Sequence, residues 1–324
     1  MDRYLRTIRL LINNLSNQSL AGQKTLNAKT PSGIVYDLYE PAQAAVATYI
    51  LVYGLDLAGE KDARLVHFAS ACASAGLRAI VPNLAGLKSY CFSLDDLQSI
   101  ADLADYLHQC FNSRVGVIGF SAGGSYALSV AADQQVEWID PLLLFSPYYS
   151  LDGIPPIRKP ETKGHLETER DWDHFIWSQL VFAFRCPDRS DFSQAEQDEL
   201  IGFLAEYCNL SPERKLANYQ RLFKDRSPVD ITENVFAGQN LSAFSLRGKL
   251  GQVKGKVFIF HDPDDYLIPP EHSKFILAEL QQRGKPDAQG LLITNLISHV
   301  TPQYGFRLVE SIQAIRMLSN LFPR

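Results

Sequence analysis

Short apolar segments alternate with amphipathic ones along most of the chain. Gly33–Tyr39 alternates apolar and polar residues, which predicts an early antiparallel strand. Further strands are predicted at Ala45–Tyr53, Leu77–Val81, Arg114–Phe120, Leu142–Phe145, Lys256–Phe260 and Leu291–Leu296. Helical spacing of apolar residues predicts helices at Ala63–Ala75, Leu94–Cys110, Gly123–Ala132, Pro270–Arg283 and Phe306–Leu321. This alternation predicts an α/β fold, a mostly parallel, doubly wound sheet covered on both faces.

The alternation stops in the middle of the chain. Residues 151–252 contain a polar, proline-bearing stretch and helical patterns, with no strand pattern. We therefore predict an α/β core formed by residues 1–150 and 253–324, with residues 151–252 inserted as a mostly helical cap or lid. Aromatic residues are concentrated in this cap segment, where they either meet an apolar substrate or form the cap's own core: Trp172, Phe175, Trp177, Phe182 and Phe184.

The amino-acid composition limits which kinds of molecule the protein is expected to bind. The 324 residues are 46% hydrophobic and 21% charged, as in an ordinary packed domain, and the net charge of −5 argues against a nucleic-acid partner. Five scattered cysteines, with no C-x-x-C pair, predict a reducing, cytoplasmic location. We expect no metal and no organic cofactor.

The N-terminal segment is amphipathic, and no stretch of the chain predicts a transmembrane helix. Apolar residues lie at helical spacing through residues 3–15, with arginines beside them. The simpler interpretation is a helix packed on the body of the protein or on a partner subunit, as in a homodimer. Contact of this helix with a membrane surface is the alternative.

The sequence Gly119-Phe120-Ser121-Ala122-Gly123 matches G-x-S-x-G between a predicted strand and a predicted helix. On so sharp a turn the serine hydroxyl is pushed out above the sheet. Glycines two residues before and after are needed because side chains there would collide with neighbouring elements. The backbone N–H of Ala122, at the start of a helix, favours a developing oxyanion.

On this motif and its position the chain resembles the α/β-hydrolase family, with a helical cap inserted after the sixth strand. In that family the acid follows a late strand and the histidine follows the last one. The resemblance implies that Asp265, in the turn after Lys256–Phe260, is the acid and that His299 is the base. Asp262 stands where the family usually has glycine, so Asp262 and Asp264 remain competitors of Asp265.

The resemblance also implies a second oxyanion donor after the strand Ala45–Tyr53. This turn reads Tyr53-Gly54-Leu55, with tyrosine where the family commonly has histidine. The backbone N–H of Leu55 is the expected donor, and an ordinary glycine at a strand end is the alternative.

A serine nucleophile indicates acyl transfer to water. The chain is therefore predicted to be a serine hydrolase of the carboxylesterase, lipase or thioesterase kind, acting on a small acyl ester or thioester through an acyl-enzyme intermediate. An amide substrate, or a lyase or acyltransferase reaction on the same residues, remains open. The alternative from another class is a non-catalytic protein of this fold that binds a ligand or a partner.

Overall fold

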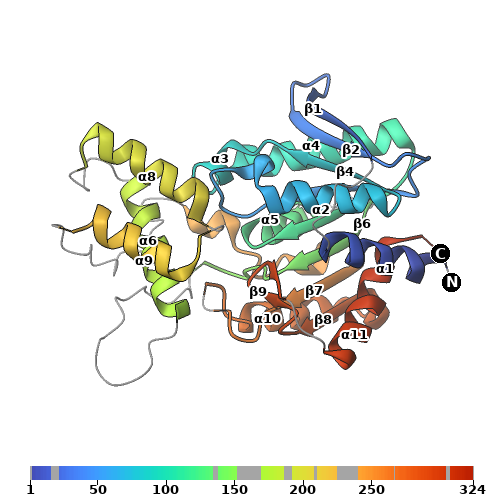
Figure 1. Ribbon diagram of the computed structural model, residues 1–324. Helices are drawn as coiled ribbons and strands as arrows, with labels where there is room; N and C mark the ends of the chain where they lie inside the picture. Colours follow the sequence, from blue (N-terminus) through green and yellow to red (C-terminus); the bar gives the residue numbers. More distant parts are fainter. Residues whose placement is uncertain are drawn as a thin grey trace.

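An eight-stranded sheet runs through the molecule (Figure 1). The computed structural model describes residues 2–15, 22–133, 138–151, 169–185, 192–207, 210–224, 240–265, 267–303 and 307–323. The strands, in the order in which they lie side by side, are β1 (Gln23–Lys29), β2 (Val35–Glu40), β4 (Leu77–Pro82), β3 (Ala47–Val52), β5 (Val115–Phe120), β6 (Ile139–Phe145), β7 (Val257–His261) and β8 (Gln289–Ile293). From β4 to β8 all neighbours are parallel, whereas β2 pairs antiparallel with both β1 and β4. The predicted mostly parallel α/β sheet is confirmed.

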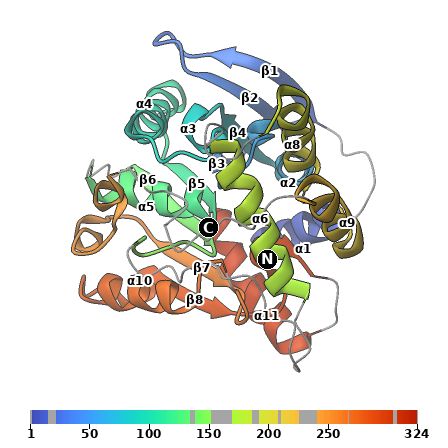
Figure 2. The ribbon, with the colours of Figure 1, turned by 90° about the vertical axis from the view of Figure 1, so that its left-hand side faces the viewer.

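Helices cover both faces of this sheet, which explains why its central strands are continuous apolar runs. Every residue of β7 is buried, and so are five of the six residues in each of β3 and β5. One face carries α1 (Asp2–Leu15), α2 (Ala63–Ser74) and α11 (Leu308–Leu318); the other carries α4 (Leu94–Phe111), α5 (Ala122–Asp133) and α10 (Glu271–Gln281) (Figure 2). A short helix, α3 (Ala85–Lys88), follows β4. Among the described residues, no helix is long and apolar enough to cross a bilayer.

The order of the strands reverses at β3, which lies between β4 and β5 although β4 follows it in the chain. In open parallel sheets, ligands bind in the crevice outside the carboxyl ends of the strands at such a reversal. The turn after β3 holds Gly54 and Leu55, and the turn after β5 holds Ser121. The topology therefore places both turns at the same candidate site.

The structure departs from the predicted elements at both edges of the sheet. The strand β1 was not predicted because its residues are polar and almost all exposed, so it carries no apolar pattern. At the other edge β8 ends at Ile293, before the predicted end at Leu296; just after it, the Thr294 hydroxyl and the Asn295 N–H both donate to the Glu310 carboxylate. Phe306, the predicted start of the last helix, lies outside the described residues.

Between β6 and β7 the described part of the cap segment is helical. It contains α6 (Glu169–Arg185), α8 (Gln194–Glu206) and α9 (Pro212–Leu222). These helices share a hydrophobic cluster separate from the main core, in which Phe175 and Phe182 are buried and Trp172, Trp177 and Phe184 pack around them. This packing favours the interpretation that the aromatic residues form the cap's own core. Three side chains touch both clusters: Leu55, Phe92 and Leu241.

Candidate active site

Ser121 occupies the sharp turn between β5 and α5. Its φ is +53°, in the left-handed region that residues other than glycine rarely adopt. The turn is fixed by two backbone hydrogen bonds, from the Ser121 N–H to the Phe145 carbonyl (2.8 Å) and from the Gly124 N–H to the Ser121 carbonyl (2.9 Å). A strained backbone held in this way by its surroundings is typical of functional sites.

The two glycines of the motif are required by close backbone contacts. A Cβ on Gly119 would lie 2.5 Å from the Gly124 Cα, and one on Gly123 would lie 2.2 Å from the Tyr53 carbonyl oxygen. Both distances are far below van der Waals contact. The start of α5 therefore packs directly against the end of β3, and the turn that carries Ser121 leaves no room for a side chain at either glycine.

The histidine and one aspartate meet at the same edge of the sheet. His299 Nδ1 lies 2.6 Å from Asp265 Oδ2. The other oxygen of Asp265 accepts the N–H groups of Leu267 and Ile268, each at 3.0 Å. With Asp265 on Nδ1, the neutral ring of His299 carries its proton there and leaves Nε2 as the acceptor.

Asp265 is almost completely buried, with 5% of its surface exposed. Burial alone would raise its pKa, but the charge and hydrogen bond of His299, with the Ile268 N–H, outweigh burial and hold the pKa below its ordinary value. Asp265 is thus the aspartate that contacts the His299 ring as an ionised group.

Asp262, the residue in place of the usual glycine, holds the backbone of His299 instead of its ring. It is 2% exposed, and its two oxygens accept the N–H of His299 and the N–H of Asp264, both at 3.0 Å. His299 sits in the turn between β9 (Ile297–Ser298) and β10 (Thr301–Pro302) with φ at +52°. Sequence reasoning considered Asp262 only as a rival acid and missed this contact; the signal was a carboxylate in place of a glycine.

His261 stabilises the turn that carries Asp265. Burial lowers its pKa, which favours the neutral ring. Its Nε2 lies 2.7 Å from the Ile268 carbonyl and its Nδ1 lies 2.6 Å from the Ser273 hydroxyl. A carbonyl only accepts, so Nε2 carries the proton and the Ser273 hydroxyl donates to Nδ1.

The end of β6 links the histidine to the serine. Phe145 accepts the Ser121 N–H, and the hydroxyl of the next residue, Ser146, donates to the His299 carbonyl at 2.8 Å. Within the described residues no hydrogen bond joins the Ser121 hydroxyl to the His299 ring. Catalytic hydrogen bonds are often long in a free enzyme and tighten with substrate. The structure therefore brings the two residues to one sheet edge, and their direct contact stays a prediction.

The turn after β3 faces Ser121. A Cβ on Gly54 would lie 3.0 Å from the Ser121 Cβ and 3.5 Å from its hydroxyl oxygen, so only glycine leaves this approach open. Tyr53, in the place of the usual histidine, ties the turn down because its hydroxyl bonds both the N–H and the carbonyl of Leu84. In the described part of the chain, no hydrogen bond uses the N–H of Leu55 or of Ala122.

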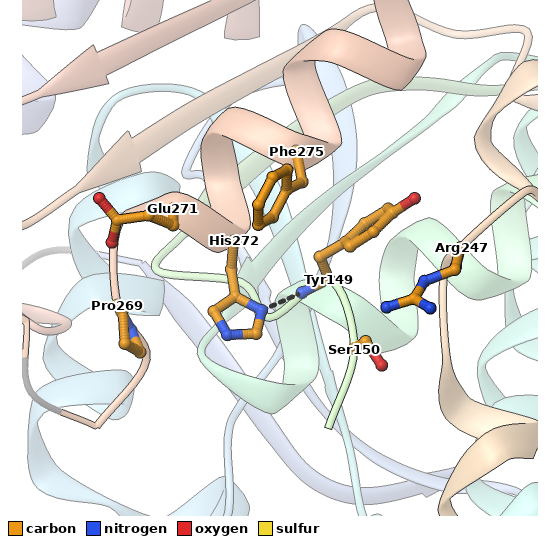
Figure 3. Close-up of a pocket in the computed structure, with 7 residues that line it drawn as sticks. All are labelled: Tyr149, Ser150, Arg247, Pro269, Glu271, His272 and Phe275. Carbon is orange, nitrogen blue, oxygen red and sulfur yellow. Dashed lines mark hydrogen bonds between the residues drawn. The ribbon is translucent and has the colours of Figure 1, made fainter. Parts of the chain in front are cut away.

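A pocket of about 510 Å³ lies beside Pro269, at the start of α10 (Figure 3). Its apolar surface comes from Tyr149, Pro269 and Phe275, and the Arg247 guanidinium points toward Tyr149 and Ser150. His272 Nδ1 accepts the Tyr149 N–H at 3.0 Å, and burial lowers the pKa of this histidine. The pocket was not predicted, because its walls come from three separate parts of the chain.

Among the described residues, no group of three or more His, Cys, Asp or Glu side chains could hold a metal ion.

Comparisons with known proteins identify the fold of the chain. No family profile and no curated protein matches the sequence. Among solved structures, the chain is similar to a serine hydrolase from the polyaromatic-hydrocarbon-degrading bacterium Cycloclasticus zankles (TM-score 0.52, 16% identity) and to the meta-cleavage product hydrolase of Pseudomonas fluorescens IP01 (TM-score 0.51, 14% identity). Each match covers 93% of this chain and 97% of the other.

Peptidases share the fold as well. Porphyromonas gingivalis dipeptidyl peptidase 4 matches with a TM-score of 0.52 and 11% identity over 93% of this chain. The chain spans only 35 to 40% of the length of five peptidase structures that it matches. At these identities the likeness establishes the fold of the serine hydrolases of the α/β-hydrolase type.

Proposed function

From the α/β-hydrolase fold of this chain, we propose that the protein is a serine hydrolase that cleaves a carboxylic ester or a thioester. Ser121 is the nucleophile, His299 the base and Asp265 the orienting acid. The observation that carries the proposal is the 2.6 Å hydrogen bond between His299 and Asp265, made at the sheet edge where Ser121 occupies a strained turn.

In the proposed reaction the Ser121 Oγ attacks the acyl carbon while His299 Nε2 takes the hydroxyl proton. The N–H groups of Leu55 and Ala122 stabilise the negative oxygen of the tetrahedral intermediate. His299 then passes the proton to the leaving alcohol or thiol as the bond to the acyl carbon breaks. Water repeats these steps on the acyl-enzyme and releases the acid.

The described lining of the pocket beside Pro269 includes neither Ser121 nor His299, so the acyl and leaving groups are identified by the substrate series below. Because peptidases share this fold, we distinguish amide cleavage by experiment.

A fluorophosphonate probe tests the nucleophile, since it reacts with an activated serine. We expect labelling of the wild type and none of Ser121→Ala, with hydrolysis of p-nitrophenyl esters reduced roughly 10⁴-fold or more in that variant. His299→Gln and Asp265→Asn should slow labelling. Ser113→Ala, at an exposed loop serine, serves as the matched control.

Ester, acyl-CoA and amino-acid anilide substrates then rank the leaving groups. We expect esters and thioesters to be cleaved faster than anilides. Folded wild-type protein that is not labelled between pH 6 and 9 would favour the non-catalytic alternative. Labelling that persists in Ser121→Ala would contradict the proposed nucleophile.

A further inference from the structure

The helices α1 and α11 together expose an unusual number of apolar side chains. Thirteen large hydrophobic residues of the described chain are exposed, and seven of them lie on these two helices: Tyr4, Leu5, Ile8, Ile12, Leu308, Val309 and Ile312. Val309, Ile12 and Leu5 are 68%, 61% and 59% exposed. So dense a group of exposed apolar residues marks an interaction surface.

The two helices pack against each other, so these residues form one surface. Both lie on the face of the sheet that also carries α2, side by side near the two chain termini (Figures 1 and 2). The helix α1 packs both on α11 and on the short turn Ser319–Leu321 that follows it, which places the two helices beside each other. The apolar residues of α1 recur at helical spacing on its outer side, while Leu10 and Thr7 are buried on the inner side. We call this surface the α1–α11 face.

The charge of the α1–α11 face is opposite to that of the whole protein. The sequences of α1 and of residues 307–318 contain five arginines, no lysine and only two acidic residues, whereas the whole chain has a net charge of −5. Asp2 is paired with Arg6, and Glu310 with Arg307. Within the described residues no acidic group pairs with Arg3, Arg9 or Arg316.

We propose that the α1–α11 face binds the surface of a membrane that contains anionic lipids. Exposed leucine, isoleucine and valine side chains can enter the boundary between headgroups and acyl chains, while arginines beside them reach the phosphates. The charge of this face is complementary to an anionic bilayer. It is not complementary to itself, because a two-fold contact between copies would oppose two faces that are both positively charged. The inference is independent of which ester the active site cleaves.

Flotation of the full-length protein with lipid vesicles tests the proposal. We expect binding to vesicles of phosphatidylcholine and phosphatidylglycerol at a ratio of three to one. Binding should weaken in high salt and be much weaker with phosphatidylcholine alone. A wild-type protein that does not float with the mixed vesicles at low salt would overturn the proposal.

Two triple variants separate the apolar and the cationic contributions. The apolar variant carries Leu5→Gln, Ile12→Gln and Val309→Gln. The cationic variant carries Arg3→Gln, Arg9→Gln and Arg316→Gln. We expect both variants to partition less to the mixed vesicles than the wild type does. For the cationic variant the expected decrease is about fivefold for each arginine removed. Circular dichroism and thermal unfolding should match the wild type, because all the altered side chains lie at the surface.

Matched controls change side chains of the same kind elsewhere. For the apolar variant the control is Leu26→Gln, Leu94→Gln and Ile201→Gln; for the cationic variant it is Arg214→Gln, Lys254→Gln and Lys285→Gln. We expect both controls to bind like the wild type. Equal losses in the controls would overturn the proposal. So would light scattering that shows a dimer of the wild type and a monomer of the apolar variant, because the face would then join two copies.

Discussion

The carboxyl edge of the sheet and the cap segment are built in different ways. At the sheet edge, main-chain geometry places each candidate group: Ser121 and His299 both have positive φ, and buried aspartates accept backbone N–H groups around them. In the described part of the cap, the helices are held by aromatic side chains in mutual contact, such as Phe175 with Trp172 and Tyr219. A site whose backbone is fixed can hold reacting atoms at well-defined positions, whereas packing between aromatic side chains tolerates changes of sequence and shape.

The largest expected effect tests whether the cap is a separate packing unit. We predict that Phe175→Ala lowers the stability of the cap by about 3–5 kcal/mol, because a large buried side chain is replaced by a cavity. Hydrogen exchange should become faster in α6, α8 and α9 and stay unchanged in β3, β5 and β7.

The matched change in the main core is Phe260→Ala, at a phenylalanine of β7 that is 3% exposed. This change should accelerate hydrogen exchange in the strands of the sheet, which Phe175→Ala should leave unchanged. If Phe175→Ala accelerates exchange in the sheet and the cap equally, the two regions unfold as one unit and the contrast between them is lost.

A second prediction sharpens the contrast at the sheet edge. Asp262→Ala removes the acceptor of the His299 N–H without touching the ring, so the ring is less well placed for proton transfer. A hydrogen bond to a charged group contributes about 1.5–3 kcal/mol, which corresponds to a decrease in kcat of roughly 10- to 100-fold with KM nearly unchanged. Steady-state kinetics on a p-nitrophenyl ester measure both constants.

Two further variants show whether Asp262 acts through position. Asp262→Asn keeps one acceptor oxygen and should recover part of the lost kcat. Asp264→Ala, at the neighbouring aspartate, should change kcat by no more than about twofold, because both N–H contacts of Asp262 remain. A decrease in kcat of the same size in Asp264→Ala would contradict a specific role for Asp262.

The parts of the site that the sequence predicted are those set by local patterns, and the parts that it did not predict depend on contacts between distant segments. The placement of Ser121 between strand and helix was predictable, because a buried apolar strand, a G-x-S-x-G motif and a helical pattern are all local signals. The turn holding His299 between β9 and β10 was not predicted, because strands of two residues carry no periodicity. Nor was the contact of Asp262 with the His299 N–H, which depends on two segments 37 residues apart.

The smallest expected effect concerns acid stability and follows from the lowered pKa of Asp265. Because the folded-state pKa is depressed, ionised Asp265 contributes stability above its unfolded-state pKa of about 3.9, and this contribution is lost as the pH falls through the folded-state value. Asp265→Asn cannot titrate and lacks the contribution at every pH. The difference in the free energy of unfolding between wild type and Asp265→Asn should thus shrink as the pH falls below about 4. Urea unfolding at a series of pH values measures it; a difference that stays constant down to pH 2.5 would mean that the buried pair with His299 does not favour the ionised carboxylate.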